Sequence, residues 1–175
     1  MKRYRYIWMI ALTMMAFTSC NKWLDIEPKD KIVDESLFSD YRGFRNSLNG
    51  IYQEMASSTL YGRELSWGLV SALGQDYSAG ESGEVYKEAQ KYNYENASVK
   101  GVIAGIWSKS YNIIANCNKL IEEIEKRDSS FFPSGASEKD LILGEALSVR
   151  AMLHFDILRL FAPAPITGDG GEYIP

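Results

Sequence analysis

The chain has 175 residues and a formal net charge of -4, and hydrophobic residues make up 46% of it. This length suits a single domain, and the hydrophobic content argues against a disordered chain. A mildly acidic chain also lacks the excess of Lys and Arg that a nucleic-acid-binding face needs, so we expect no nucleic-acid partner.

The first 19 residues have the pattern of a bacterial export signal. The basic stretch MKRYR precedes the apolar run YIWMIALTMMAF, which as a helix would span about 18 Å, less than the roughly 30 Å of a bilayer core. A cleaved signal peptide is therefore favoured over a membrane-spanning helix. Residues 17–20, FTSC, resemble a lipobox, which predicts lipidation of Cys20 and attachment to a membrane surface. The alternative is an ordinary signal peptide followed by a chance cysteine.

Residues 20–36 are interpreted as an extended, lipidated tether, because they are charged, contain Pro28 and have only weak apolar periodicity. If Cys20 carries the lipid, Cys117 is the one cysteine left, and no intramolecular disulfide can form. Cys117 lies on the apolar face of a later predicted helix, so we expect a buried, unreactive thiol.

A helix is predicted from about Ser39 to Met55, because apolar residues recur there at steps of three and four. Gly43 and Gly50 weaken this helix by up to about 1 kcal/mol each relative to alanine, and close approach of another helix is one reason to place glycine there. A shorter helix is predicted within residues 60–73. A polar, glycine-rich loop follows at residues 74–83.

Four tyrosines without helical or alternating order come next: Tyr77, Tyr86, Tyr92 and Tyr94. An aromatic ring can pack against the apolar face of a sugar, while a neighbouring carboxylate or amide binds its hydroxyl groups. Asp76, Asn93 and Glu95 could supply such polar groups. We therefore take Asp76 and the four tyrosines as candidate oligosaccharide-binding residues. The alternative is that the tyrosines pack the loop onto the helices and leave their hydroxyls in water.

Two strong helical patterns follow, and the linker between them, with Pro133 and Gly135, predicts an antiparallel hairpin. The first pattern has an apolar stripe from Ile103 to Ile124. The second helix is predicted from about Ser137 to Phe161, with Ser137 and Asp140 as a capping box and two prolines after its end. Six residues form the stripe that this helix is expected to bury: Leu143, Leu147, Ala151, His154, Leu158 and Phe161.

Motifs for catalysis are absent from the sequence. It has no Gly-rich phosphate loop, no metal-type spacing of Cys and His, and no serine elbow, so we expect no metal, no cofactor and no enzymatic activity. The single histidine, His154, is expected to be packed rather than catalytic. Asp76, Glu81 and Glu84 could supply a glycosidase carboxylate pair, although acids in a polar loop are usually only solvated.

Several short motifs, in order along the chain, resemble the N-terminal part of the SusD/RagB nutrient-uptake lipoproteins of the Bacteroidetes. They start with the lipid-signal cysteine and with Leu24-Asp25 before Pro28, and continue with LNGIY at residues 48–52 and WSKSYNIIANCN at residues 107–118. The similarity is clearest between residues 144 and 161, in GEA, VRA, HFD and RLF. The APAP that follows departs from the glycine before proline that is common in the family, and proteins of the family are much longer.

The resemblance implies an all-α fold of tetratricopeptide-like antiparallel helix pairs with a long aromatic-rich loop, in an incomplete domain of residues 37–175. It also implies a surface-exposed outer-membrane lipoprotein that binds oligosaccharides or peptides without catalysis. Such a protein hands its ligand to a TonB-dependent outer-membrane barrel of the SusC type. The alternative is a helical scaffold that docks on the barrel and has no ligand site. We further expect the last helix to be under-covered, with Leu153, Ile157 or Leu160 exposed.

Overall fold

The computed structural model describes residues 36–80 and 83–162, and it divides the chain into two units, Met1–Ser36 and Leu37–Pro175. Cys20, the expected signal peptide and the tether up to Glu35 lie outside the described residues, as do Glu81 and the two prolines after Ala162. The described core residues all belong to the second unit, between Phe38 and Ile157. Removal of the first 19 residues therefore removes none of this core.

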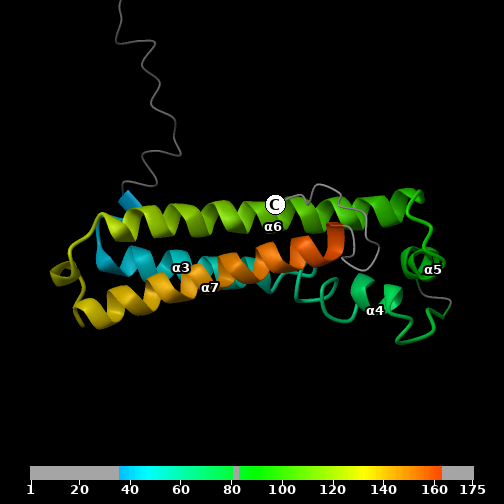
Figure 1. Cartoon of the computed structure of the whole chain (residues 1–175), viewed down its shortest axis with the longest axis horizontal. Helices are drawn as coiled ribbons and strands as arrows, with labels where there is room; N and C mark the ends of the chain where they lie inside the picture. Colours follow the sequence, from blue (N-terminus) through cyan, green and yellow to red (C-terminus); the bar gives the residue numbers. More distant parts are fainter. Residues whose placement is uncertain (1–35, 81–82, 163–175) are drawn as a thin grey trace, which may run out of the picture. The chain divides into compact units, whose positions relative to one another are not determined.

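The second unit is built from helices, and its described residues contain no β-strand (Figure 1). Three helices are long: α3 (Tyr41–Met55), α6 (Ala97–Glu125) and α7 (Ala136–Phe161). Three are short: α4 (Leu69–Leu73), α5 (Glu84–Gln90) and the 3-10 helix η2 (Ser129–Phe131). α6 packs against α7, α3 and α5, and α3 also contacts α7. The all-α prediction is confirmed.

α3 begins at the residue after Asp40, whose carboxylate accepts a hydrogen bond from the backbone N–H of Arg42 at 3.4 Å. Its core face buries Phe44, Leu48 and Ile51. A Cβ added to Gly43 would lie 1.6 Å from the carbonyl oxygen of Leu37. Glycine is therefore required there by the segment that leads into the helix, and not by a neighbouring helix.

α6 and α7 form the predicted antiparallel hairpin, with η2 in the connection between them (Figure 1). The side chain of Asn96 caps α6 by accepting from the N–H of Ser98 at 2.9 Å. The capping box predicted for α7 is wrong. Gly135, with φ of +62°, is the N-cap residue and provides no side chain, so Ser137 already lies inside the first turn.

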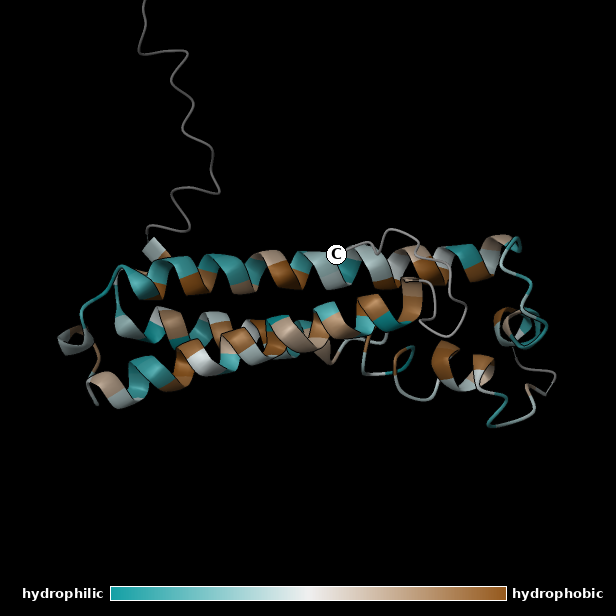
Figure 2. Ribbon diagram, in the orientation of Figure 1, coloured by the Kyte–Doolittle hydropathy of each residue, from teal (hydrophilic) through white to brown (hydrophobic). Residues whose placement is uncertain are grey.

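The face that α7 turns to the core differs from the prediction. α7 buries the following residues: Ile142, Ala146, Val149, Leu153, Asp156 and Ile157. Leu153 and Ile157 were expected to be exposed, but they are 0% and 2% exposed, and Leu160 is half-buried. Leu147 and Leu158, from the stripe expected to be buried, are exposed, and so is His154. α7 is apolar on two sides, and Figure 2 shows hydrophobic colour recurring along it, so periodicity could not identify the buried side.

The segment between α3 and α6 is more structured than the expected loop. Within residues 60–73 only Leu69–Leu73 is helical, after a series of turns, and α5 interrupts the tyrosine-rich stretch. Cys117 is fully buried in α6, as predicted, and burial raises the pKa of its thiol to about 11.

Candidate ligand-binding region

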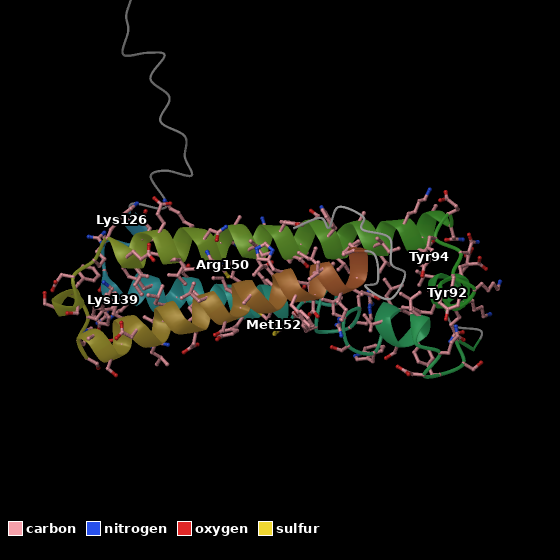
Figure 3. The ribbon with its side chains drawn as sticks, viewed as in Figure 1. Tyr92, Tyr94, Lys126, Lys139, Arg150 and Met152 are labelled. Atoms are coloured by element: carbon pink, nitrogen blue, oxygen red, sulfur yellow. The ribbon has the colours of Figure 1, made fainter. Side chains whose placement is uncertain are left out.

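The tyrosine-rich stretch packs where α4, α5 and the first turns of α6 meet. α5 contacts both α4 and α6. Tyr92 and Tyr94 lie between α5 and α6, at the end of the unit away from the α6–α7 connection (Figure 3). The side chains of this region are therefore positioned by three helices and not by a free loop.

Tyr92 and Tyr94 form an exposed aromatic pair. Their side chains are 53% and 47% exposed, their ring centroids lie 6.5 Å apart, and the rings are tilted by 52°. The hydroxyl of Tyr92 donates to the carbonyl oxygen of Leu73 at 3.1 Å, which ties this ring to the end of α4. Tyr92 has φ of +56°, a left-handed conformation that is uncommon for an aromatic residue. The ring is thus held in one orientation beside α4.

Glu88 fixes the turn that carries the pair. Its carboxylate accepts a hydrogen bond from the side-chain amide of Asn93 at 2.7 Å and one from the ammonium of Lys91 at 2.7 Å. These two partners, Lys91 first, lower the pKa of Glu88 below its ordinary value. Asn93 lies between the two tyrosines in the sequence, so its hydrogen bond to Glu88 helps to position both rings.

The next charged residue along the chain, Glu95, forms an ion pair with Lys100. Glu95 lies 2.6 Å from the ammonium of Lys100, and this hydrogen bond lowers the pKa of the Glu95 carboxyl. Both side chains are well exposed, so the pair contributes little to the free energy of unfolding. Glu95 keeps oxygens that face water next to Tyr94 and can accept hydrogen bonds from hydroxyl groups.

Tyr86 and Tyr77 belong to a different cluster, around the buried carboxylate of Glu64. The Tyr86 hydroxyl lies 3.1 Å and 3.3 Å from the two Glu64 oxygens, and that of Tyr77 donates to the carbonyl of Gly68 at 3.5 Å. Burial, followed by the Glu64 charge, raises the pKa of both tyrosines. These hydrogen bonds fasten α5 and the loop before it to the segment before α4. The alternative interpretation expected the hydroxyls to lie in water, but both are hydrogen-bonded to the protein.

Asp76 is exposed at the start of the loop, and its backbone N–H donates to the carbonyl of Ser71 at 3.1 Å. Gln90 forms two hydrogen bonds to the same loop. Its side-chain oxygen accepts from the N–H of Ala79 at 3.2 Å, and its side-chain nitrogen donates to the carbonyl of Tyr77. Of the five candidates, Tyr92 and Tyr94 are the two that a ring contact brings together in the described part of the chain.

Glu64 was missed by sequence reasoning. It is 2% exposed and accepts hydrogen bonds from the N–H of Leu69 at 3.0 Å and from Arg63 at 2.7 Å. It also lines a cavity of about 280 Å³ with five other residues: Thr59, Ser98, Gly101, Val102 and Gly105. The cavity opens between the segment before α4 and the first turns of α6. The sequence signal was weak: an Arg63-Glu64 pair between the apolar residues of a predicted helix.

Trp67 was also missed as a candidate, although its side chain is 61% exposed. It lies on the turns that lead into α4. Exposed indole rings serve the same kind of sugar contact as tyrosine rings. Nothing in the local sequence pattern separated this tryptophan from a core residue.

The described residues around the Tyr92–Tyr94 pair offer exposed aromatic rings and hydrogen-bonding groups. No group of acids, cysteines and histidines able to hold a metal ion is found among residues 36–80 and 83–162. Asp76 and Glu84 are both exposed, and Glu81 lies outside the described residues, so the expected glycosidase pair has no described geometry. Exposed rings with nearby acceptors suit an uncharged, hydroxyl-rich ligand.

Residues 22–170 match a protein family described as SusD-like, starch-binding and associating with the outer membrane. The chain belongs to the SusD-like family. The match covers the whole described part of the chain, including the tyrosine-rich stretch. The tetratricopeptide-like helix pairs expected for a SusD-like protein agree with the α6–α7 hairpin packed on α3.

Two SusD-like relatives come from Formosa agariphila. SusD-like protein P2 is 22% identical over 165 residues, which are 94% of this chain and 31% of the relative. SusD-like protein P25 is 24% identical over 153 residues, which are 84% of this chain and 28% of the relative. The chain thus spans about a third of the length of these relatives. No solved structure matches the chain.

The family description places SusD-like proteins at the outer membrane. Among the described residues, no helix combines the length and the apolar character that crossing a bilayer requires. α6 and α7 are long enough, but charged residues recur along both.

Proposed function

We propose that this protein captures an oligosaccharide at the outer membrane by binding alone, and that Tyr92 and Tyr94 are the described residues that contact the sugar. The exposed Tyr92–Tyr94 pair is the main support for this proposal. Among the described site candidates, these are the two exposed rings that contact each other. The family description, starch-binding, supports a glucan as the ligand. No catalytic step is part of the proposal.

The geometry of the pair suits weak, reversible capture. Rings 6.5 Å apart and tilted by 52° present two apolar surfaces to successive sugar residues of a curved chain. Glu95 follows Tyr94 in the sequence and is exposed, so its carboxylate can offer hydrogen-bond acceptors to the hydroxyl edges. A site with two rings and few polar contacts predicts a Kd of about 10 μM to 1 mM, which allows a ligand to be released again.

The test is calorimetric titration of the chain from residue 20 onward, carrying Cys20→Ser, with maltoheptaose. Tyr92→Ala combined with Tyr94→Ala should weaken binding by about tenfold or more, which corresponds to about 1.4 kcal/mol. Phe155→Ala is the control, because it removes an aromatic ring from α7 that is even more exposed, at 62%. Binding that survives the double substitution would refute the assigned residues.

We also propose that residues 1–19 are a lipoprotein signal peptide, that residues 20–36 are a tether lipidated at Cys20, and that residues 37–175 form the helical ligand-binding domain. The FTSC sequence before the cleavage point supports this assignment. Labelled palmitate should enter the wild-type protein in bacterial cells and should not enter the Cys20→Ala variant. Incorporation that is equal in both would exclude Cys20 as the acceptor.

A TonB-dependent outer-membrane barrel is the proposed recipient of the ligand. Membership of a family that associates with the outer membrane supports this partner. The lipidated protein should retain a barrel protein during purification from detergent-solubilised outer membranes. If a barrel is retained but titrations show no glycan binding, the alternative function is favoured, in which the protein is a scaffold without a ligand site.

A further inference from the structure

The turn that carries Tyr92 and Tyr94 is supported by two short helices. The first is α5, which ends two residues before Tyr92. The backbone N–H groups of Tyr92 and Asn93 donate to carbonyl oxygens of α5 at 2.9 Å and 3.0 Å. The second is α4, whose last residue, Leu73, accepts the hydrogen bond from the Tyr92 hydroxyl at 3.1 Å. The position of the two rings therefore depends on where α4 and α5 lie.

α5 has little apolar packing of its own. Among its seven residues, all of which the structure describes, Ala89 is the one that is fully buried. Val85 and Tyr86 are half-buried against the core. A helix of this length is not stable in isolation, so its position depends on contacts with the rest of the fold. With so little apolar burial, hydrogen bonds from its side chains have a large share in fixing it.

The buried carboxylate of Glu64 binds both supporting helices. The hydroxyl of Tyr86, in α5, lies 3.1 Å and 3.3 Å from its two oxygens. The backbone N–H of Leu69, the first residue of α4, donates to Oε2 at 3.0 Å. Glu64 is 2% exposed, so bulk water competes little for these hydrogen bonds. One carboxylate thus links α4 to α5.

Gly68 leaves the space that this carboxylate occupies. A Cβ added to Gly68 would lie 2.6 Å from Oε2 of Glu64. A side chain at this position would therefore push the carboxylate away from its place beside Leu69. The other oxygen, Oε1, accepts from the guanidinium of Arg63 at 2.7 Å, and this ion pair balances the charge. The location of the carboxylate is fixed by both contacts.

We propose that Glu64 is a positioning residue for the sugar site, because it fixes α4 and α5 relative to each other and so holds the Tyr92 and Tyr94 rings together. It acts through Tyr86 and Leu69 and does not itself contact the ligand. This inference rests on the proposed function for the identity of the ligand. Its effect on the turn can be measured without any sugar.

Amide hydrogen exchange tests the link to α5. Tyr86→Phe, in the Cys20→Ser chain from residue 20 onward, keeps the ring and removes the hydroxyl. The N–H groups of Tyr92 and Asn93 should then exchange about tenfold faster, because α5 loses its hydrogen bond to a buried carboxylate. Tyr52→Phe is the control, since the Tyr52 hydroxyl donates to a carboxylate of α7 at 2.7 Å. It should leave both exchange rates unchanged.

Calorimetric titration with maltoheptaose tests the effect on the site. Glu64→Leu should weaken binding by about tenfold or more, because both supports lose their common acceptor. Glu64→Gln keeps a side-chain oxygen and should recover part of the affinity, which a role for side-chain volume alone does not predict. Tyr86→Phe should weaken binding in proportion to the faster exchange, and it keeps the test decisive if Glu64→Leu does not fold.

The two readouts separate this inference from the proposed function. Unchanged exchange at Tyr92 and Asn93 in Tyr86→Phe would overturn the inference. So would sugar binding that neither Tyr86→Phe nor Glu64→Leu weakens, and the proposed function would then stand. If exchange becomes faster but the unsubstituted Cys20→Ser chain binds no maltoheptaose, Glu64 does position the rings, and the proposed function is wrong.

Discussion

The hydroxyl of Tyr61 lies 2.6 Å from a carboxylate oxygen of Asp156, and this hydrogen bond joins the turns before α4 to the core face of α7. Asp156 is 8% exposed, and its other oxygen accepts from Arg159. Burial, followed by the hydrogen bond to Asp156, raises the pKa of Tyr61 well above its ordinary value. The buried carboxylate is therefore satisfied by one residue of its own helix and one that is distant in sequence.

Tyr61→Phe should lower the free energy of unfolding by about 1–3 kcal/mol, because the Asp156 carboxylate loses a donor in a buried position. Tyr52→Phe is the matched control. Tyr52 donates to Glu145 at 2.7 Å, but both groups face solvent, and the loss should stay below about 1 kcal/mol. Urea denaturation measures both values. Equal effects of the two substitutions would mean that burial of Asp156 does not determine the loss in free energy of unfolding.

Gly43→Ala and Gly50→Ala should change stability in opposite directions although both lie in α3. The added Cβ at position 43 would overlap the Leu37 carbonyl oxygen, so we expect a loss of about 1–3 kcal/mol or more. At position 50 nothing lies within 4 Å of the added Cβ, and better helix propensity should give a gain of about 0.5–1 kcal/mol. Thermal unfolding followed by circular dichroism compares them. A stabilising Gly43→Ala would contradict the close contact with Leu37.

The Cys117 thiol should resist thiol reagents in the folded Cys20→Ser chain at pH 8. Its pKa of about 11 exceeds the ordinary value of 9.0, so the reactive thiolate is rare, and the side chain is fully buried. The same shift removes stability only when the pH rises above the unfolded pKa, because the unfolded chain then loses a proton that the folded chain keeps. Reaction with a chromogenic disulfide reagent should be slow in buffer and fast in denaturant. Equally fast reaction in buffer would show that the thiol is accessible.

Acidification should loosen the turn that holds the tyrosine pair. The pKa of Glu88 is lowered in the folded protein, so its contribution is present above the ordinary value of 4.5 and is lost as the pH falls through the lower folded value. An NMR titration of the Glu88 side chain should show the depressed pKa, and Lys91→Met should return it towards 4.5. An unchanged Glu88 pKa in the Lys91→Met variant would show that Lys91 does not lower it.

The sequence predicted the helices that are long and strongly periodic, and it failed where a residue's position depends on distant partners. α6 and α7 were anticipated with their connection, because their apolar residues repeat over many turns. The buried side of α7 could not be chosen, since Leu153 and Leu158 are equally apolar and only packing against α3 and α6 distinguishes them. α5, at seven residues, is too short for periodicity to reveal.

The candidate site residues fall into two groups in the structure, and the sequence could not separate them for a similar reason. Tyr86 and Tyr92 look alike in the sequence, but Tyr86 binds Glu64, which lies 22 residues earlier, whereas Tyr92 stays exposed beside Tyr94. Local pattern carries no information on such a pairing, because the fold alone brings Glu64 to α5. We therefore place the proposed sugar contact on the exposed Tyr92–Tyr94 pair, and a role for Asp76, Tyr77 or Tyr86 stays a prediction.

The most direct test of the proposed function is an amide NMR titration of the Cys20→Ser chain with maltoheptaose. We predict saturable shifts at Tyr92, Asn93 and Tyr94, while the amides of α7 around Ala151 stay unchanged. Half-saturation should occur at about 10 μM to 1 mM sugar. A spectrum that remains unchanged at about 10 mM maltoheptaose, or one in which the shifts lie away from the Tyr92–Tyr94 turn, would contradict the proposal.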